Sequence, residues 1–130
     1  MKFRAVVLPA LFAIGTVMSS LTAHAAGDVA KGKKAFGKCK ACHAVQAGKN
    51  KIGPYLAGVM GRQAGTARGY KKYKGLKGAD WAWDDASMDA YLTDPKKFTK
   101  EKTGKKSAMN LKTKNKKQRA NLIAYLKTLK

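Results

Sequence analysis

Both cysteines of this 130-residue chain stand in one pentapeptide, CKACH, at residues 39–43. Two thiols at this spacing fit three kinds of chemistry: a disulfide, a thioredoxin-like redox pair, or covalent attachment of haem. A redox pair is expected beside a β-α-β pattern, and the surrounding sequence has none. The histidine that directly follows the second cysteine favours haem, because Cys-x-x-Cys-His is the signature of haem attachment.

The spacing has a direct physical interpretation. On one helical turn, Cys39 and Cys42 can both reach the vinyl groups along one edge of a porphyrin. His43 then lies over the ring, where its imidazole can bind iron. We therefore expect one covalently attached haem c, which would also give a small and highly charged domain the large apolar centre that it otherwise lacks.

Residues 1–25 have the layout of a secretory signal peptide. Lys2 and Arg4 form a charged start, an apolar run covers residues 5–17, and the small residues at 23–25 fit a cleavage site. A membrane anchor needs about 20 apolar residues, and this run is shorter. The sequence predicts cleavage after about residue 25, export to the periplasm, and one mature domain over residues 26–130.

The number of histidines in the chain limits which residue can be the second ligand of the iron. The chain has two histidines, and one of them, His24, lies in the predicted signal peptide. After cleavage His43 is the only histidine, which excludes bis-histidine ligation within one chain. The opposite axial position must go to methionine, lysine, an exogenous ligand or nothing.

The chain is strongly basic, with 28 Lys and Arg against seven Asp and Glu, and a formal charge of +21. Without the predicted signal peptide, which holds two of the basic residues and none of the acidic ones, the charge is +19. Such a charge attracts anionic partners and says nothing about fold. An exported protein rarely meets nucleic acid, so acidic protein surfaces or anionic lipid headgroups are the expected partners. Any single lysine is more simply explained as part of a solvated surface.

Caps and apolar spacing predict three helices in a single all-α domain. The first runs from about 29 to 42 after Asp28, and the second opens at Asp84 or Asp85 and ends at Asp94-Pro95, because the residue before proline leaves helical geometry. The third follows Asn115, with Gln118 in capping-box position. Residues 44–78 are expected to be mostly loops, and residues 96–106 a loop with at most one turn of helix.

Taken together, the motifs resemble those of class I cytochromes c, and among them the bacterial cytochromes c2. The resemblance covers residues 27–129 and is carried by GDVAKGKKAF before CKACH, KIGPYLAGVMGRQAGT, WAWDDASMDAYLTDPKKF and RANLIAYLKTL. It implies an all-α haem fold in which the N- and C-terminal helices cross. In that fold Gly32 and Phe36 would meet Leu122 and Tyr125.

The resemblance also implies roles for individual residues. Pro54 would accept a hydrogen bond from the haem-ligating His43, and Tyr91 would lie near a sulfur ligand. Among Met60, Met88 and Met109, the last matches the distal iron ligand, although Ala108 and Leu111 depart from the residues usual beside it. Three further positions match residues near a buried haem propionate, and each also has a plain interpretation as a surface arginine or a core aromatic: Arg62, Tyr73 and Trp83.

The function implied is that of a soluble single-electron carrier and not an enzyme. Its expected partners are membrane complexes: a quinol–cytochrome c oxidoreductase (cytochrome bc1 complex) as donor, and cytochrome c oxidase or a photosynthetic reaction centre as acceptor. The protein is expected to be a monomer. The alternatives are a five-coordinate haem peroxidase or gas-binding protein, and a basic polyanion-binding module. The lysines expected to steer acidic partners are Lys38, Lys40, Lys51, Lys96, Lys97 and Lys112.

Overall fold

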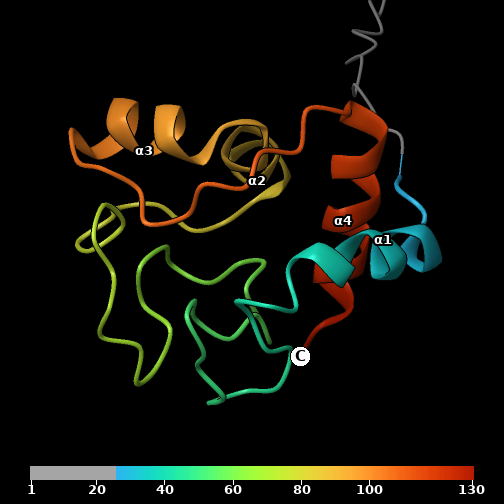
Figure 1. Ribbon diagram of the computed structural model, residues 1–130, viewed down its shortest axis with the longest axis horizontal. Helices are drawn as coiled ribbons and strands as arrows, with labels where there is room; N and C mark the ends of the chain where they lie inside the picture. Colours follow the sequence, from blue (N-terminus) through green and yellow to red (C-terminus); the bar gives the residue numbers. More distant parts are fainter. Residues whose placement is uncertain (1–25) are drawn as a thin grey trace, which may run out of the picture.

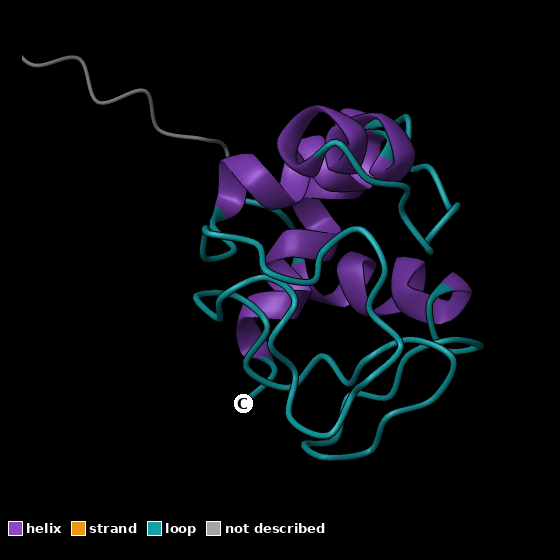
Figure 2. Ribbon diagram, turned by 90° about the vertical axis from the view of Figure 1, so that its left-hand side faces the viewer, coloured by secondary structure: helices purple, strands orange, loops and turns teal. Residues whose placement is uncertain are grey.

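The computed structural model describes residues 26–130, so the predicted signal peptide lies outside the described residues. Figure 1 shows the helices α1 (Val29–Ala35), α2 (Asp85–Thr93), α3 (Pro95–Thr103) and α4 (Lys116–Thr128). A single residue, Asp94, separates α2 from α3, and loops join the other helices (Figure 2). The strand-like pairing within the described residues is an isolated bridge between Gln63 and Ala82. The expected all-α class is confirmed. None of the helices described between residues 26 and 130 has the length and apolar character needed to span a bilayer.

The first helix begins as predicted and ends earlier. The Asp28 carboxylate accepts a hydrogen bond from the Lys31 amide and caps α1. The predicted extension to residue 42 is wrong, because the α-helix ends at Ala35 and tightens into a 3₁₀ turn, η1 (Phe36–Lys38). Gly37 is a poor helix former, and α-helices often end in such a turn. CKACH therefore lies on an irregular turn just beyond the helix.

Helices α1 and α4 cross in close contact, as the resemblance implies. A β-carbon on Gly32 would stand 1.9 Å from the Asn121 carbonyl oxygen and 2.8 Å from the Tyr125 β-carbon, so only glycine permits this approach. The Phe36 and Tyr125 rings pack with centroids 5.3 Å apart. The Asp28 amide also donates to the Asn121 side chain at 2.8 Å. Gly32 thus meets α4 at Asn121 and at Tyr125, one of the two expected residues.

Helix α2 has the predicted boundaries. Asp84 and Ser87 form a reciprocal capping box at its start, and Asp94 ends it. The predicted cap of α4 is also present, since the Asn115 side chain accepts from the Gln118 amide.

The prediction of a loop over residues 96–106 is wrong. Asp94 caps α3, Pro95 occupies the first helical turn, and Gly104 ends the helix with a φ of 70°. Proline is favoured at the start of a helix, and glycine just after its end. The buried side chains of α3 are Pro95, Phe98 and Thr99, and the rest of its sequence is mostly lysine and exposed. This narrow apolar face was hidden by the basic composition.

The core lies between three parts of the chain. In Figure 1 the crossed pair α1 and α4 stands on one side, α2 and α3 on another, and the loops of residues 44–84 on the third. Aromatic rings join the second and third parts, with Trp83 5.0 Å from Tyr91 and 6.1 Å from Phe98 between ring centroids. These three parts, together with the segment between α3 and α4, enclose the site described below.

Candidate functional site

A cavity of about 500 Å³ lies at the meeting point of the helices and the loops. Protein interiors contain few voids larger than a water molecule, so a cavity of this size indicates a large ligand. Its wall is mainly apolar, and an apolar cavity is suited to a flat hydrophobic group. The apolar side chains in the wall include Phe36, Leu56, Val59, Trp83, Met88, Leu92, Leu122 and Leu126.

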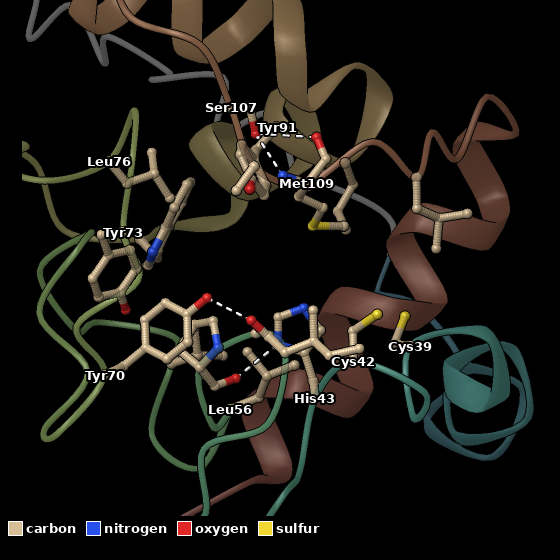
Figure 3. A pocket seen from close by; sticks show the side chains of 18 of the residues that line it. Cys39, Cys42, His43, Leu56, Tyr70, Tyr73, Leu76, Tyr91, Ser107 and Met109 are labelled. Atoms are coloured by element: carbon tan, nitrogen blue, oxygen red, sulfur yellow. Dashed lines mark hydrogen bonds between the residues drawn. The ribbon is translucent and has the colours of Figure 1, made fainter.

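The two cysteines stand at one edge of the cavity as free thiols. The turn that carries them is held by the Cys39 carbonyl, which accepts from the Cys42 amide at 3.1 Å and from the His43 amide at 2.9 Å. Both sulfur atoms lie on the same side in Figure 3. Burial raises the pKa of the Cys39 thiol, and the neighbouring Cys42 adds to the effect. The turn thus presents two thiols to one edge of a bound group, as thioether attachment requires.

The imidazole of His43 forms part of the cavity wall beside them. Its Nδ1 lies 2.7 Å from the Pro54 carbonyl oxygen. Because a carbonyl can only accept, Nδ1 carries the proton and the lone pair of Nε2 is free to bind a metal. Burial lowers the pKa of His43, with the Pro54 hydrogen bond opposing, so the neutral ring is favoured. The hydrogen bond that the resemblance implies for Pro54 is therefore present.

Met109 lies across the cavity from His43 (Figure 3). Its backbone is held on both sides by one hydroxyl, since Ser107 Oγ accepts from the Met109 amide and donates to the Met109 carbonyl, each at 3.1 Å. Tyr91 lies beside Ser107; burial raises the pKa of its phenol, and the interaction with Ser107 opposes that rise. Met88 is 5% exposed and packs in the core, as expected. Met60 packs against the same core, and the residues that line the cavity do not include it.

The three residues matched to a propionate site also line the cavity, beside the loop wall. Arg62 donates to the carbonyls of Tyr55 at 3.0 Å and Ala57 at 3.2 Å, so its guanidinium is fixed in place. The Tyr73 hydroxyl accepts from the Ala67 amide at 3.1 Å. Trp83 is 6% exposed. A fixed cation, a phenol and an indole at one wall suit a carboxylate-bearing edge of the ligand.

Sequence reasoning missed Tyr70. Its hydroxyl donates to the Ile52 carbonyl at 2.6 Å, and its ring lies 4.7 Å from that of Tyr73, edge to face. It lines the cavity and ties two distant parts of the loop wall together. The signal was a pair of tyrosines three residues apart in a segment otherwise rich in glycine and lysine.

Lysines surround the segment that carries Met109. A surface hollow of about 640 Å³ borders Ser107, Ala108 and Asn110. Lys38 lines the cavity itself. Lys112 is paired with Asp94 at 2.6 Å, and Lys51 donates to the Lys40 carbonyl. The lysines that line the hollow are Lys74, Lys96, Lys97, Lys100 and Lys106.

Comparison with known proteins identifies the class. The family described as "Cytochrome c" matches residues 29–130. The cytochrome c2 of Rhodospirillum rubrum is 42% identical over 119 residues, covering 86% of this chain and 88% of that protein. Cytochrome c-550 of Paracoccus versutus is 42% identical over 113 residues, covering 77% of this chain and 73% of the relative. The solved cytochrome c2 of Rhodospirillum centenum superposes with a TM-score of 0.73 at 36% identity, covering 79% of this chain and 98% of that one.

The fold and the site define a haem protein with the class I cytochrome c fold. The chain belongs to the cytochrome c family, and within it resembles the bacterial cytochromes c2 and c-550. Its cofactor is one haem c, joined covalently through Cys39 and Cys42. The residues present fit this group, because the cavity offers an apolar wall, two thiols at one edge and an imidazole beside them.

Proposed function

We propose that the protein is an exported single-electron carrier whose haem iron is held by His43 and Met109. The observation that carries the proposal is the position of these two side chains on opposite walls of one apolar cavity. His43 and Met109 would hold a haem bound there, and the group would supply exchange of single electrons with no site left for a substrate. We infer a carrier and not an enzyme.

The protein residues prepare the site in distinct ways. Cys39 and Cys42 fix the edge of the group, and the Pro54 carbonyl orients His43 and makes its free nitrogen a better donor. Ser107 sets the backbone of Met109. Tyr91 lies beside Ser107, and burial raises the pKa of its phenol, so the O–H group would remain available as a donor on this side of the cavity.

The loop wall would hold the charged edge of the group. Arg62 is held by two carbonyls and has guanidinium N–H groups left over, since a guanidinium carries five donors. Tyr73 retains its own O–H donor, because its oxygen is the acceptor in the bond from Ala67. With the Trp83 indole, these donors would neutralise and hydrogen-bond buried propionates.

We propose that the lysines near the cavity guide acidic redox partners. The hollow beside Ser107 is lined by five lysines and no carboxylate, and Lys38 stands at the cavity. The partners proposed are a cytochrome bc1 complex as donor, and a cytochrome c oxidase or a reaction centre as acceptor, with peripheral contact to anionic membrane surfaces. The carrier would act as a monomer.

The location is proposed from the sequence of residues 1–25. Their charged start, apolar run and small residues favour removal as a signal peptide and a mature domain over residues 26–130. A carrier exported in this way would work in the periplasm. Mass spectrometry of the protein recovered from a periplasmic extract tests both points, because it gives the processed N-terminus and the mass of the attached haem together.

The visible and near-infrared spectrum tests the ligation. Histidine and methionine ligands give a low-spin haem when reduced and a weak sulfur–iron band in the near infrared when oxidised. A high-spin spectrum would instead support the rival five-coordinate peroxidase or gas-binding protein. Absence of haem from the natural protein would leave only a basic polyanion-binding module.

A further inference from the structure

Arg119 is the one buried residue with a charged side chain among residues 26–130, and it is 7% exposed. Its Nε donates to Asp89 Oδ1 at 2.7 Å, and Nη2 lies 3.4 Å from Asp89 Oδ2. Nη1 donates to two backbone carbonyls, Thr113 at 2.9 Å and Lys114 at 2.8 Å. Hydrogen bonds from a charged donor are among the stronger ones in proteins, and the planar fork of arginine fixes all four acceptors relative to one another.

The two carbonyls belong to the end of the segment that carries Met109. This segment leaves α3 at Gly104 and enters α4 at Lys116. Residues 110–112 are exposed, so packing does little to fix the chain between Met109 and Thr113, and the ion pair of Lys112 with Asp94 at 2.6 Å is a restraint within this stretch. The Thr113 amide donates to the Leu92 carbonyl on α2 at 2.8 Å. Upstream, Ser107 holds the other side of Met109.

We propose that Arg119, Asp89 and the carbonyls of Thr113 and Lys114 form a clamp that determines how readily Met109 gives up its place at the iron. The inference rests on the proposed function of Met109 as a ligand. With the clamp in place, the segment has few conformations in which Met109 is withdrawn. Without it, the released segment gains conformational entropy, and the withdrawn state becomes more populated.

A second ion pair joins the same two helices and provides a control. Lys127 on α4 lies 2.6 Å from Asp85 on α2, with side chains 51% and 41% exposed. The hydrogen bonds described for this pair include none to the Met109 segment. Exposed pairs of this kind contribute little to stability. If the Arg119 clamp acted only by joining α2 to α4, the two pairs would have effects of the same kind.

The experiment measures the affinity of the oxidised holoprotein for imidazole, which can bind only when Met109 has left the iron. We expect Arg119→Met to raise this affinity about ten- to a hundredfold, in line with the loss of several bonds from a charged donor. Arg119→Lys keeps the charge and loses the fork, so its rise should be intermediate. Lys127→Met should stay within about threefold of the wild type.

General loss of stability is controlled with Leu129→Ala, which truncates a partly buried side chain at the end of α4. The rise in imidazole affinity, relative to the unfolding free energy lost, should be smaller for Leu129→Ala than for Arg119→Met. If Arg119→Met does not fold around haem, Arg119→Lys and Asp89→Asn take its place, with smaller rises expected in the same order. Asp89→Asn retains an acceptor for Arg119 and removes the opposing charge.

Two negative outcomes differ in meaning. If the wild type shows the sulfur–iron band, and the Arg119 and Asp89 variants bind imidazole no better than Lys127→Met or Leu129→Ala, the clamp is refuted and the proposed ligation stands. If the wild type itself lacks the band and binds imidazole as an open iron does, the ligation by Met109 and the clamp are refuted together.

Discussion

The ring of His43 lies against the backbone of Gly53, so that a β-carbon on Gly53 would stand 2.4 Å from imidazole Cε1 and 2.7 Å from Nδ1. The next residue, Pro54, provides the carbonyl that holds this ring. One turn of chain thus leaves room for the imidazole and also fixes its orientation. A side chain at residue 53 would interfere with both functions.

We expect Gly53→Ala to displace His43 and to lower the free energy of unfolding by about 1–3 kcal/mol, the usual cost of overpacking. The low-spin spectrum of the holoprotein should change with it. Gly37→Ala is the matched control, because a β-carbon there meets no atom within 4 Å. That variant should be neutral or more stable by about 0.5–1 kcal/mol. Denaturant unfolding followed by haem absorbance measures both, and equal behaviour of the two variants would contradict the prediction.

Met109→Ala should open the distal side of the iron. The expected results are loss of the sulfur–iron band, a lower reduction potential and new affinity for carbon monoxide, since the thioether raises the potential. Met88→Ala, in the buried core, should keep the band and lose about 2–5 kcal/mol of stability. Near-infrared absorbance and redox titration distinguish the two. Our assignment would be wrong if Met88→Ala or Met60→Ala removed the band and Met109→Ala kept it.

Replacement of both Cys39 and Cys42 by alanine should give a chain that does not fold, because the haem fills the centre of the core. In the wild type the haem should remain with the protein through acid–acetone extraction. Circular dichroism and the extracted haem absorbance check these outcomes. A folded double variant that still held covalent haem would contradict the attachment.

Electron transfer to an acidic partner should slow steeply as salt increases, because charge attraction at the surface is screened over about 8 Å at physiological ionic strength. Lys38→Glu, Lys96→Glu or Lys97→Glu should reduce the association rate more than Lys130→Glu. Stopped-flow or flash-induced oxidation at several salt concentrations measures this. Rates independent of salt, or equal effects of all four changes, would indicate that the lysines serve solubility alone.

Stability should fall in acid partly through the helix caps Asp84 and Asp94. Hydrogen bonds from Ser87 lower the pKa of Asp84 below the ordinary 3.8, and bonds from Lys112 and then the Lys97 amide lower the pKa of Asp94. A carboxylate with a lowered folded-state pKa contributes stability that is present above the unfolded value and is lost as pH falls through the folded value. The stabilisation should therefore disappear below pH 3.8.

Asp84→Asn and Asp94→Asn keep a cap and remove the charge. The difference in unfolding midpoint from the wild type should be present near neutral pH and shrink below pH 3.8. Asp80→Asn is the control, because the described hydrogen bonds include none to its carboxylate. A difference that grows as pH falls would show that the sign is wrong.

The features that could be predicted from the sequence are mainly those set by residues close together in the chain, and not those set by contacts between distant residues. CKACH and the caps at Asp28, Asp84 and Asn115 involve residues three or four apart, so their geometry is set by short stretches of chain. The length of the first helix was overestimated because the lysines continue past Gly37, and a single glycine among them does not by itself locate the change to a 3₁₀ turn.

Other features depended on contacts that a single sequence does not reveal. Helix α3 was missed because its three buried side chains, Pro95, Phe98 and Thr99, lie under a lysine-rich surface. Tyr70 bonds to Ile52 across 18 residues, and Arg119 reaches Asp89 across 30. No sequence motif has these spacings, so neither contact could be predicted from the sequence. The ligand positions themselves, His43 and Met109, stay predictions until the spectra are measured.

The crossing of α1 and α4 sets the order in which the protein can be assembled. Helix α1 has seven residues, too few to be stable alone, and its partner lies 93 residues away along the chain at the Asp28–Asn121 hydrogen bond. A chain delivered from its N-terminus exposes CKACH long before α4 exists to close the fold. The topology therefore allows both thiols to be joined to haem before the last helix docks.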